Sequence, residues 1–268
     1  MEKKFLLRNG ISKCLTRAAY NVGAVALGFC IIADAAAFFE YASIDFTKDT
    51  PSDLGIPPGQ PGYGAYPEGL VTTPQGVPFD IGPIGGNAMW CPGGCAGFGV
   101  NGTYSMTAPV GLSGLHTVYT LMNTAWVAPG ETLTKVEFKF EGIATPYFAR
   151  LTDGDDLRDG LGNGPINGVS TVPAFHIPVG VHGAPWNIDM QAFSIPNFLW
   201  DKTLTDITFT TDRSVFHHGI FLRGITASTL DHVTPGAISL VPEPETYAML
   251  LAGLGLVGFM ARRRKQNA

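Results

Sequence analysis

KVEFKFE, residues 135–141, is the stretch that decides the fold most clearly. Val136, Phe138 and Phe140 alternate strictly with charged residues, and a period of two places these three apolar side chains on one face of a β-strand. Such a strand covers a hydrophobic core with one face and meets water with the other. The segment therefore predicts a half-buried strand in a β-sheet.

Other parts of the chain show the same pattern. Residues 205–211 place Ile207 and Phe209 inward. Residues 186–192 put apolar side chains on one side of a strand and polar ones on the other, namely Trp186, Ile188, Met190 and Ala192 against Asn187, Asp189 and Gln191. We expect further strands at residues 42–46, 77–81, 117–123, 169–177, 220–225 and 238–240.

Turn residues separate these strands, and the chain has 34 glycines and 20 prolines, which disfavours long helices. We take residues 51–69 and 87–102 as long irregular loops. The pattern predicts a mainly β protein in which residues 38–240 form one antiparallel β-sandwich or jelly-roll domain.

Charge is distributed unevenly along the sequence. The whole chain has 17 basic and 22 acidic residues, but residues 38–261 have 8 basic against 20 acidic residues, a net charge of −12. Binding to nucleic acid or to anionic lipid requires clustered Lys and Arg, so this body is not expected to bind either. It suits divalent cations or neutral sugars.

The first 37 residues have the composition of a secretory signal peptide. Five basic residues precede an apolar run at 18–33, and Ala35 and Ala37 supply the small side chains that signal peptidase requires at its cleavage site. An uncleaved N-terminal anchor is the alternative, because Asp34 interrupts the small residues before that site. Both interpretations predict that the middle of the chain is exported.

The C-terminal residues 241–268 have a different composition. Pro242, Glu243 and Pro244 precede a run of 15 residues, 247–261, without charge. A spanning helix needs about 20 apolar residues, but bilayer thinning and snorkelling of the basic end can close the gap. We expect a single transmembrane helix, stopped on the cytoplasmic side by Arg262, Arg263, Arg264 and Lys265.

Proline constrains the segment before this helix. Pro242 and Pro244 fix φ and remove two backbone donors, so we expect neither a helix nor a sheet to take up the segment. Glu243 then stands in an extended peptide as the one carboxylate that a protease could recognise. A plain linker before an ordinary anchor is the alternative.

Together, the Pro-Glu-Pro segment, the apolar helix and the Arg-rich end resemble the PEP-CTERM sorting signal of Gram-negative bacteria that make extracellular polysaccharide. The resemblance covers residues 241–268 and implies that an exosortase, a membrane enzyme, recognises Pro242, Glu243 and Pro244. It further implies that the chain is anchored in the inner membrane before processing and is then at the cell surface or outside the cell.

Parts of the body resemble galactose-binding-like jelly rolls of secreted bacterial proteins. The stretches that carry this resemblance are GVPFDIG, HTVYTLMNTAW with VEFKFEG, and LTDGDDLRDG, at residues 76–82, 116–126 with 136–142, and 151–160. They contain no diagnostic residue, so they support the fold rather than a function.

Cys91 and Cys95 are the cysteines that remain after removal of a signal peptide. In an oxidising compartment the two can pair across the glycines of C-P-G-G-C, so a disulfide is favoured. Free thiols, or a metal or redox role, are the alternatives. A metal site would need further ligands close by, and a redox C-x-x-C motif has one residue fewer.

Acidic residues crowd into one turn. Asp153, Asp155 and Asp159, with Asp156 between them, offer oxygen ligands of the kind that calcium prefers. The spacing does not fit an EF-hand, and a solvated acidic turn is favoured. Calcium is the only cofactor the sequence suggests.

Tryptophans could form flat platforms for sugar rings. Trp90 and Trp200 lie near turns and are the candidates for exposure, although a core position is the ordinary fate of a tryptophan. We assign no catalytic residue: G-x-S-x-G is absent, and the spacing of His176 and His182 matches no zinc motif.

These observations favour an exported, exosortase-processed protein whose body is a non-enzymatic component that binds, or forms a matrix with, extracellular polysaccharide. The alternative is a secreted hydrolase that acts on such polysaccharide through a pair of carboxylates. A purely structural role is a third possibility. The expected partners are signal peptidase, the exosortase, the inner membrane and extracellular polysaccharide.

Overall fold

The computed structural model describes residues 39–48, 50–51, 66–83, 87–92, 102–125, 130, 132–160, 166–178, 185–213 and 219–266. The predicted signal peptide, residues 1–37, lies outside these ranges. Within them the chain is mainly β, built from antiparallel sheets, and its α-helix, α1 (Pro244–Gln266), stands at the C-terminal end. This confirms the predicted fold class.

Five strands form one sheet in the order β15-β9-β8-β12-β6. Its strands are β15 (Val241–Pro242), β9 (Tyr147–Thr152), β8 (Thr132–Phe140), β12 (Leu204–Arg213) and β6 (Gly102–Leu112). The KVEFKFE stretch lies in the central strand β8, where Val136, Phe138 and Phe140 are buried and Lys139 is exposed, as the alternation predicts.

The second sheet has six strands, in the order β1-β13-β7-β11-β10, with β14 pairing in parallel with β11. These strands are β1 (Tyr41–Ser43), β13 (Gly219–Ser228), β7 (Thr117–Ala125), β11 (Trp186–Ser194), β10 (Thr171–Ile177) and β14 (Ile238–Ser239). A short 3₁₀ turn, η1 (Asn197–Leu199), follows β11.

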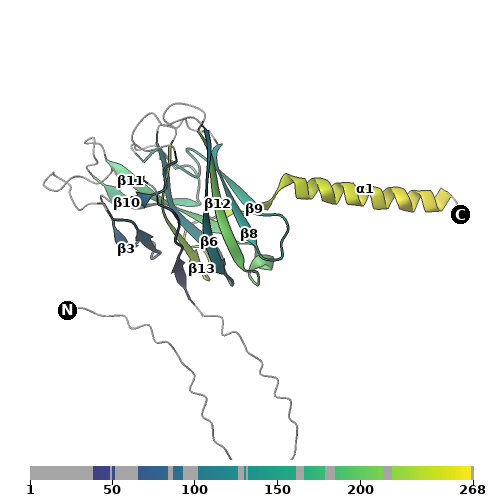
Figure 1. Ribbon diagram of the computed structural model, residues 1–268, viewed down its shortest axis with the longest axis horizontal. Coiled ribbons are helices and arrows are strands. Elements are labelled where there is room, and N and C mark those ends of the chain that lie inside the picture. Colours follow the sequence, from purple (N-terminus) through teal and green to yellow (C-terminus); the bar gives the residue numbers. More distant parts are fainter. Residues whose placement is uncertain are drawn as a thin grey trace, which may run out of the picture. The chain divides into compact units, whose positions relative to one another are not determined.

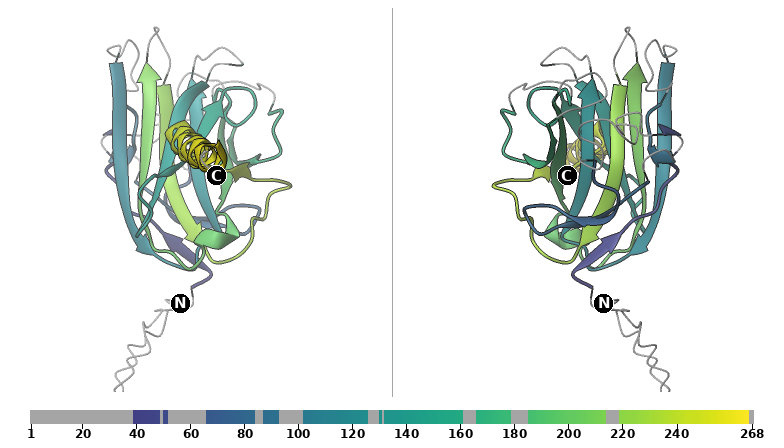
Figure 2. Two further views of the ribbon diagram at one scale, coloured as in Figure 1. Left: turned by 90° about the vertical axis from the view of Figure 1, so that its right-hand side faces the viewer. Right: turned by 90° about the vertical axis from the view of Figure 1, so that its left-hand side faces the viewer.

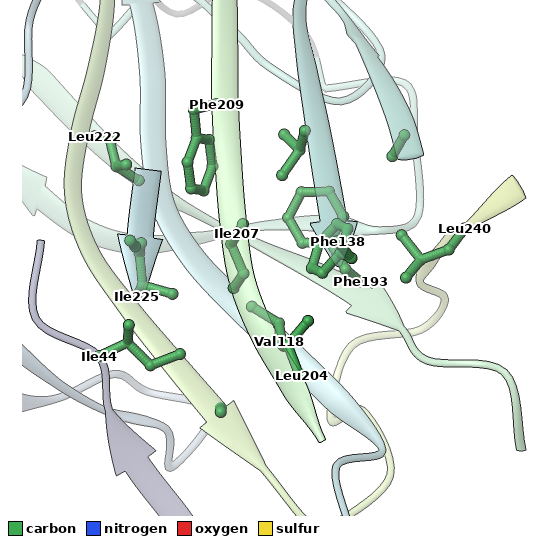
Figure 3. Close-up of a cluster of buried hydrophobic side chains, with 14 of the residues drawn as sticks. Ile44, Val118, Phe138, Phe193, Leu204, Ile207, Phe209, Leu222, Ile225 and Leu240 are labelled. Carbon is green, nitrogen blue, oxygen red and sulfur yellow. The ribbon is translucent and has the colours of Figure 1, made fainter. Parts of the chain in front are cut away.

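The two large sheets pack face to face and enclose the main core (Figure 1; Figure 2). The rings of Phe138 and Phe193, one from each sheet, meet with centroids 5.4 Å apart. Ile207, Phe209 and Leu222 belong to the same cluster and have no exposed surface (Figure 3). Complete burial of such a side chain stabilises the fold by about 2 kcal/mol.

A second apolar cluster covers the outer face of the six-stranded sheet. Two short strand pairs contribute to it: β5 (Asn87–Met89), which pairs with β2 (Thr50–Pro51), and the hairpin of β3 (Gly69–Thr72) and β4 (Pro78–Ile81). Phe79 of β4 lies so close to β13 that a Cβ on Gly224 would stand 2.9 Å from its ring. A side chain at position 224 would therefore push this layer away from the sheet.

This outer layer corrects the expectation for residues 186–192. The alternation is present, but β11 is buried on both faces, since the outer cluster covers Ile188 and Met190 while the polar residues Asp189 and Gln191 face other buried groups. The layer also uses residues that we expected to lie in loops. Tyr66 of the outer cluster falls within the expected loop 51–69, and strand β5 falls within the expected loop 87–102.

Two long strands were not predicted. Strand β6 contains Gly102, Pro109 and Gly111, residues that usually interrupt strands. These residues are tolerated because β6 lies at the edge of its sheet. Strand β9 ends at Thr152, directly before the acidic segment that we expected to be a turn.

Candidate functional site

Residues 238–243 join the two large sheets to the C-terminal helix. Strand β14 pairs with β11 of the six-stranded sheet, and only one residue later β15 pairs with β9 of the five-stranded sheet. Leu240, between the two strands, is 6% exposed and belongs to the main core (Figure 3). Strand pairing with the sandwich therefore continues to Pro242.

The two prolines occupy positions that tolerate them. Pro242 lies opposite Tyr147 in β15, an edge strand, where the missing N–H breaks no ladder on the open side. Pro244 begins α1, where a missing N–H would have had no helical partner. The expectation that neither sheet nor helix takes up this segment is therefore wrong.

Glu243, between these prolines, is held by a group of side chains that we call the Lys135 site: Lys135, Glu137, Phe148 and Arg150. The Lys135 ammonium donates hydrogen bonds to the Glu243 carboxylate and, over 3.0 Å, to that of Glu137. Lys135 Nζ and Arg150 Cζ lie 5.0 and 5.6 Å from the centre of the Phe148 ring. Both cations thus stand where the ring's electrons attract them.

The charges of the Lys135 site change the titration of Glu243. The hydrogen bond from Lys135 holds the pKa of the Glu243 carboxyl below its ordinary value, although burial acts to raise it. Arg150 adds a smaller attraction in the same direction. Burial lowers the pKa of Lys135, but its hydrogen bonds to the two carboxylates outweigh this and the pKa is raised. Both partners are therefore charged at neutral pH.

Helix α1 follows directly. Apolar side chains from Tyr247 to Met260 are 50–76% exposed, in contrast to every apolar side chain of the core. Arg262 is exposed near its end, and the backbone of Arg263, Arg264 and Lys265 continues the helix. An exposed apolar surface of this kind marks a segment that meets another protein or lipid.

Among the residues that the structure describes, no helix combines the length and the apolar character that crossing a membrane requires. The predicted transmembrane helix is therefore not confirmed.

The acidic segment 153–160 does not gather its carboxylates around a metal. Asp153 is buried and accepts a hydrogen bond of 2.6 Å from Thr124 Oγ1, while Asp155 is exposed. Asp159 forms a bridge to Thr124 through its backbone. The described residues contain no group of three or more His, Cys, Asp or Glu side chains that could hold an ion.

Instead, this segment fills a gap in the six-stranded sheet. Residues 158–160 insert between β7 and β11 through backbone hydrogen bonds: Thr124 N to Arg158 O, Gly160 N to Thr124 O, and Asn187 N to Gly160 O. The segment acts as a short additional strand where β7 and β11 diverge.

A buried ion pair closes the same gap, and sequence reasoning missed it. Arg158 holds Asp189 by two hydrogen bonds of 2.7 Å, and Asn123 Nδ2 donates a third over 2.8 Å. The Asp189 side chain has no exposed surface. Burial raises the pKa of this carboxyl even though Arg158 and Asn123 act to lower it. A charged residue in an alternating strand was the available signal.

Arg223 is a second buried cation. It is fully buried in β13, its Nε donates to Tyr66 Oη over 3.0 Å, and its Nη1 and Nη2 atoms have no hydrogen-bond partner among the described residues. Its guanidinium lies 5.4 Å from the centre of the Phe221 ring. Unlike Arg158, this arginine thus has only some of its hydrogen-bond donors paired within the described part of the chain.

The tryptophan candidates differ from expectation. Trp90 is 4% exposed and forms a backbone bridge with Leu222, so the expectation that its ring is exposed is wrong. Trp200 is half-buried, and His116 stacks on one face of its ring at 3.6 Å. That stacking leaves at most the other face of Trp200 for a ligand. His176 Nδ1 forms a hydrogen bond of 2.9 Å with Asn187 Oδ1. His182 lies outside the described residues.

Cys91 is buried and forms a disulfide bond. Cys95 lies outside the described residues, so the pairing of Cys91 with Cys95 stays a prediction. The same holds for the signal peptidase site at Ala35 and Ala37.

An open hollow of about 520 Å³ lies beside the β3-β4 hairpin. Its polar lining includes Lys48, Glu68, Asp80 and Asn87, and Lys48 Nζ donates to the backbone oxygen of Asp80 over 3.2 Å. These side chains offer both donors and acceptors of hydrogen bonds.

A β-sandwich that continues into a Pro-Glu-Pro segment, an apolar helix and a basic end has the layout of an exported protein with a C-terminal sorting signal. Residues 240–265 match the family model of the PEP-CTERM protein-sorting motif. The chain thus carries a C-terminal PEP-CTERM protein-sorting motif, which supports its sorting by an exosortase. No curated protein and no solved structure matches it.

Proposed function

We propose that the exosortase cuts the chain within or next to Pro242, Glu243 and Pro244 and thereby separates the sandwich from α1. The match of residues 240–265 to the sorting motif is the observation that carries this proposal. The exposed apolar side chains of α1 support a role in bringing the segment to the inner membrane, where the exosortase resides. Removal of residues 1–37 by signal peptidase at Ala37 would precede this step.

Comparison of host strains with and without the exosortase tests the proposal. The full chain is followed by immunoblotting with an antibody against the sandwich. We expect a shorter product, in the medium or at the cell surface, in the strain that has the enzyme, and a longer form in the membrane fraction of the strain that lacks it. An identical product in both strains would contradict the proposal.

We further propose that the processed sandwich is a non-enzymatic component that binds extracellular polysaccharide. The hollow beside β3 and β4 supports this, because Lys48, Glu68, Asp80 and Asn87 offer hydrogen-bonding groups that suit sugar hydroxyls. The acidic body also favours a neutral polymer over an anionic one.

Retention of the processed protein on the host's own polysaccharide tests this second proposal. We expect the double variant Glu68→Gln, Asp80→Asn to lose retention about fivefold, the effect of about one net hydrogen bond. The matched control is Glu141→Gln, Asp201→Asn, which removes the same two charges from exposed positions outside the hollow. If the wild-type protein is not retained on the polysaccharide at all, the polysaccharide-binding role is contradicted.

A further inference from the structure

The sorting motif is not freely accessible in the folded protein. Three successive contacts hold it: Leu240 lies in the main core, β15 pairs with β9 through Val241 opposite Phe148, and Glu243 bonds Lys135. The Glu243 side chain is only 21% exposed. The residues that a sorting enzyme must read are therefore already bound by the domain.

The domain and the enzyme compete for the same groups. A peptide in a protease-type cleft presents extended backbone and its recognised side chains to the enzyme. In this protein the backbone of residues 241–242 pairs with β9, and the carboxylate of Glu243 is occupied by Lys135. Because one carboxylate and one strand edge cannot serve both partners, the segment must leave the Lys135 site before it is cut.

The contacts are weak enough to be reversible. Strand β15 has two residues and lies at the sheet edge, and the Lys135–Glu243 pair is partly exposed, with 25% and 21% of the two side chains accessible. Short edge strands open locally at a fraction of the free energy of global unfolding. Such a segment exchanges between docked and released states while the sandwich stays folded.

Glu137 sets the balance between these states. Lys135 shares its ammonium between Glu137 and Glu243, so two carboxylates stand around one cation. Removal of Lys135 leaves these carboxylates to repel one another, and neutralisation of Glu137 removes that repulsion. Changes at the two positions should therefore shift docking in opposite directions.

We propose that the edge of β9 and the Lys135 site form an intramolecular docking surface for the Pro-Glu-Pro segment, and that release from this surface limits the rate of exosortase processing. The inference rests on the proposed function, since it concerns the regulation of the same cleavage. It assigns to Lys135 a role outside the sorting motif itself.

Pulse-chase labelling of the full chain in the native host, with exosortase present, tests the inference. We expect Lys135→Met to be processed about threefold to fivefold faster than wild type, because a partly exposed ion pair shifts an equilibrium by less than tenfold. Glu137→Gln should be processed about twofold more slowly. Lys139→Met is the matched control, since Lys139 lies on the same strand and is exposed, and it should keep the wild-type rate.

The outcomes separate the two proposals. If the wild-type chain is not cut by the exosortase, the proposed function fails. If the wild type is cut but Lys135→Met and Glu137→Gln keep its rate, the docking surface fails while the proposed function stands. Should Lys135→Met not fold, the decision falls to Glu137→Gln, whose rate must fall below that of wild type.

Discussion

Lys135, in the strand that the sequence predicts best, donates a hydrogen bond to Glu243, the central residue of the sorting motif. The contact spans 108 positions of the chain. It places the sorting motif against a central strand of the sandwich, so this ion pair is one of the contacts that link folding of the sandwich to presentation of the motif.

Docking of the segment should weaken in acid. The pKa of Glu243 in the docked state lies below its ordinary value of 4.5, and Lys135, Glu137 and Arg150 are the charged groups that face it. A carboxyl with a depressed pKa stabilises the docked state above its ordinary pKa, and this stabilisation is lost as the pH falls through the docked pKa. We expect the segment to be docked more firmly at pH 7 than below pH 4.5.

Carbon-13 NMR titration of the Glu243 carboxyl in the full chain measures this linkage. In Lys135→Met the pKa of Glu243 should move up from its wild-type value, because the largest cause of the depression is gone. Coincident titration curves in the wild type and the variant would argue that the ion pair does not form in solution.

Leu240 should hold the segment more strongly than Lys135 does. Truncation of a buried leucine removes about 2–5 kcal/mol of packing, so Leu240→Ala should release the segment and speed exosortase processing at least tenfold. The control is Leu230→Ala, because Leu230 is 41% exposed. Equal processing of both variants in the pulse-chase experiment would show that core packing does not restrain the motif.

The buried pair of Arg158 and Asp189 should matter far more for stability than a surface pair does. Asp189→Ala leaves the Arg158 guanidinium, 12% exposed, without its carboxylate and should cost about 3–5 kcal/mol in the free energy of unfolding by urea. The exposed pair of His116 and Asp231 provides the comparison, and Asp231→Ala should cost less than about 1 kcal/mol. Similar losses for the two variants would contradict the role of Asp189.

The main core should respond in the same way to truncation. Phe138 is fully buried against Phe193, so Phe138→Ala should lower the free energy of unfolding by about 3–5 kcal/mol. Its neighbour Lys139 is exposed, and Lys139→Ala should change the free energy of unfolding by less than about 0.5 kcal/mol. Thermal unfolding followed by circular dichroism distinguishes these outcomes.

The sequence predicts the sandwich well where one face of a strand meets water. Val136 and Phe138 in β8, and Ile207 and Phe209 in β12, are buried as their alternation requires, because each strand has only one core to cover. Strand β11 departs from this rule. A second layer covers its outer face, and no pattern within residues 186–192 announces a layer built from residues 66–91.

The candidate site was predictable in part. The order of Pro-Glu-Pro segment, helix and basic end is a local pattern, so it was visible in the sequence and is confirmed by the family match. The attachment of Glu243 to Lys135 depends on strand pairing across the sheet, which local spacing does not encode. Trp90 was misjudged for a similar reason, since it belongs to a core cluster with residues far along the chain, Leu222 among them.

The intact mass of the protein recovered from the envelope and the medium of an exosortase-containing host tests the central claim most directly. We predict a chain that begins at residue 38 and ends within or next to residues 242–244, and that lacks all of α1 beyond that point. A mass equal to that of residues 1–268, in both fractions, would contradict the account.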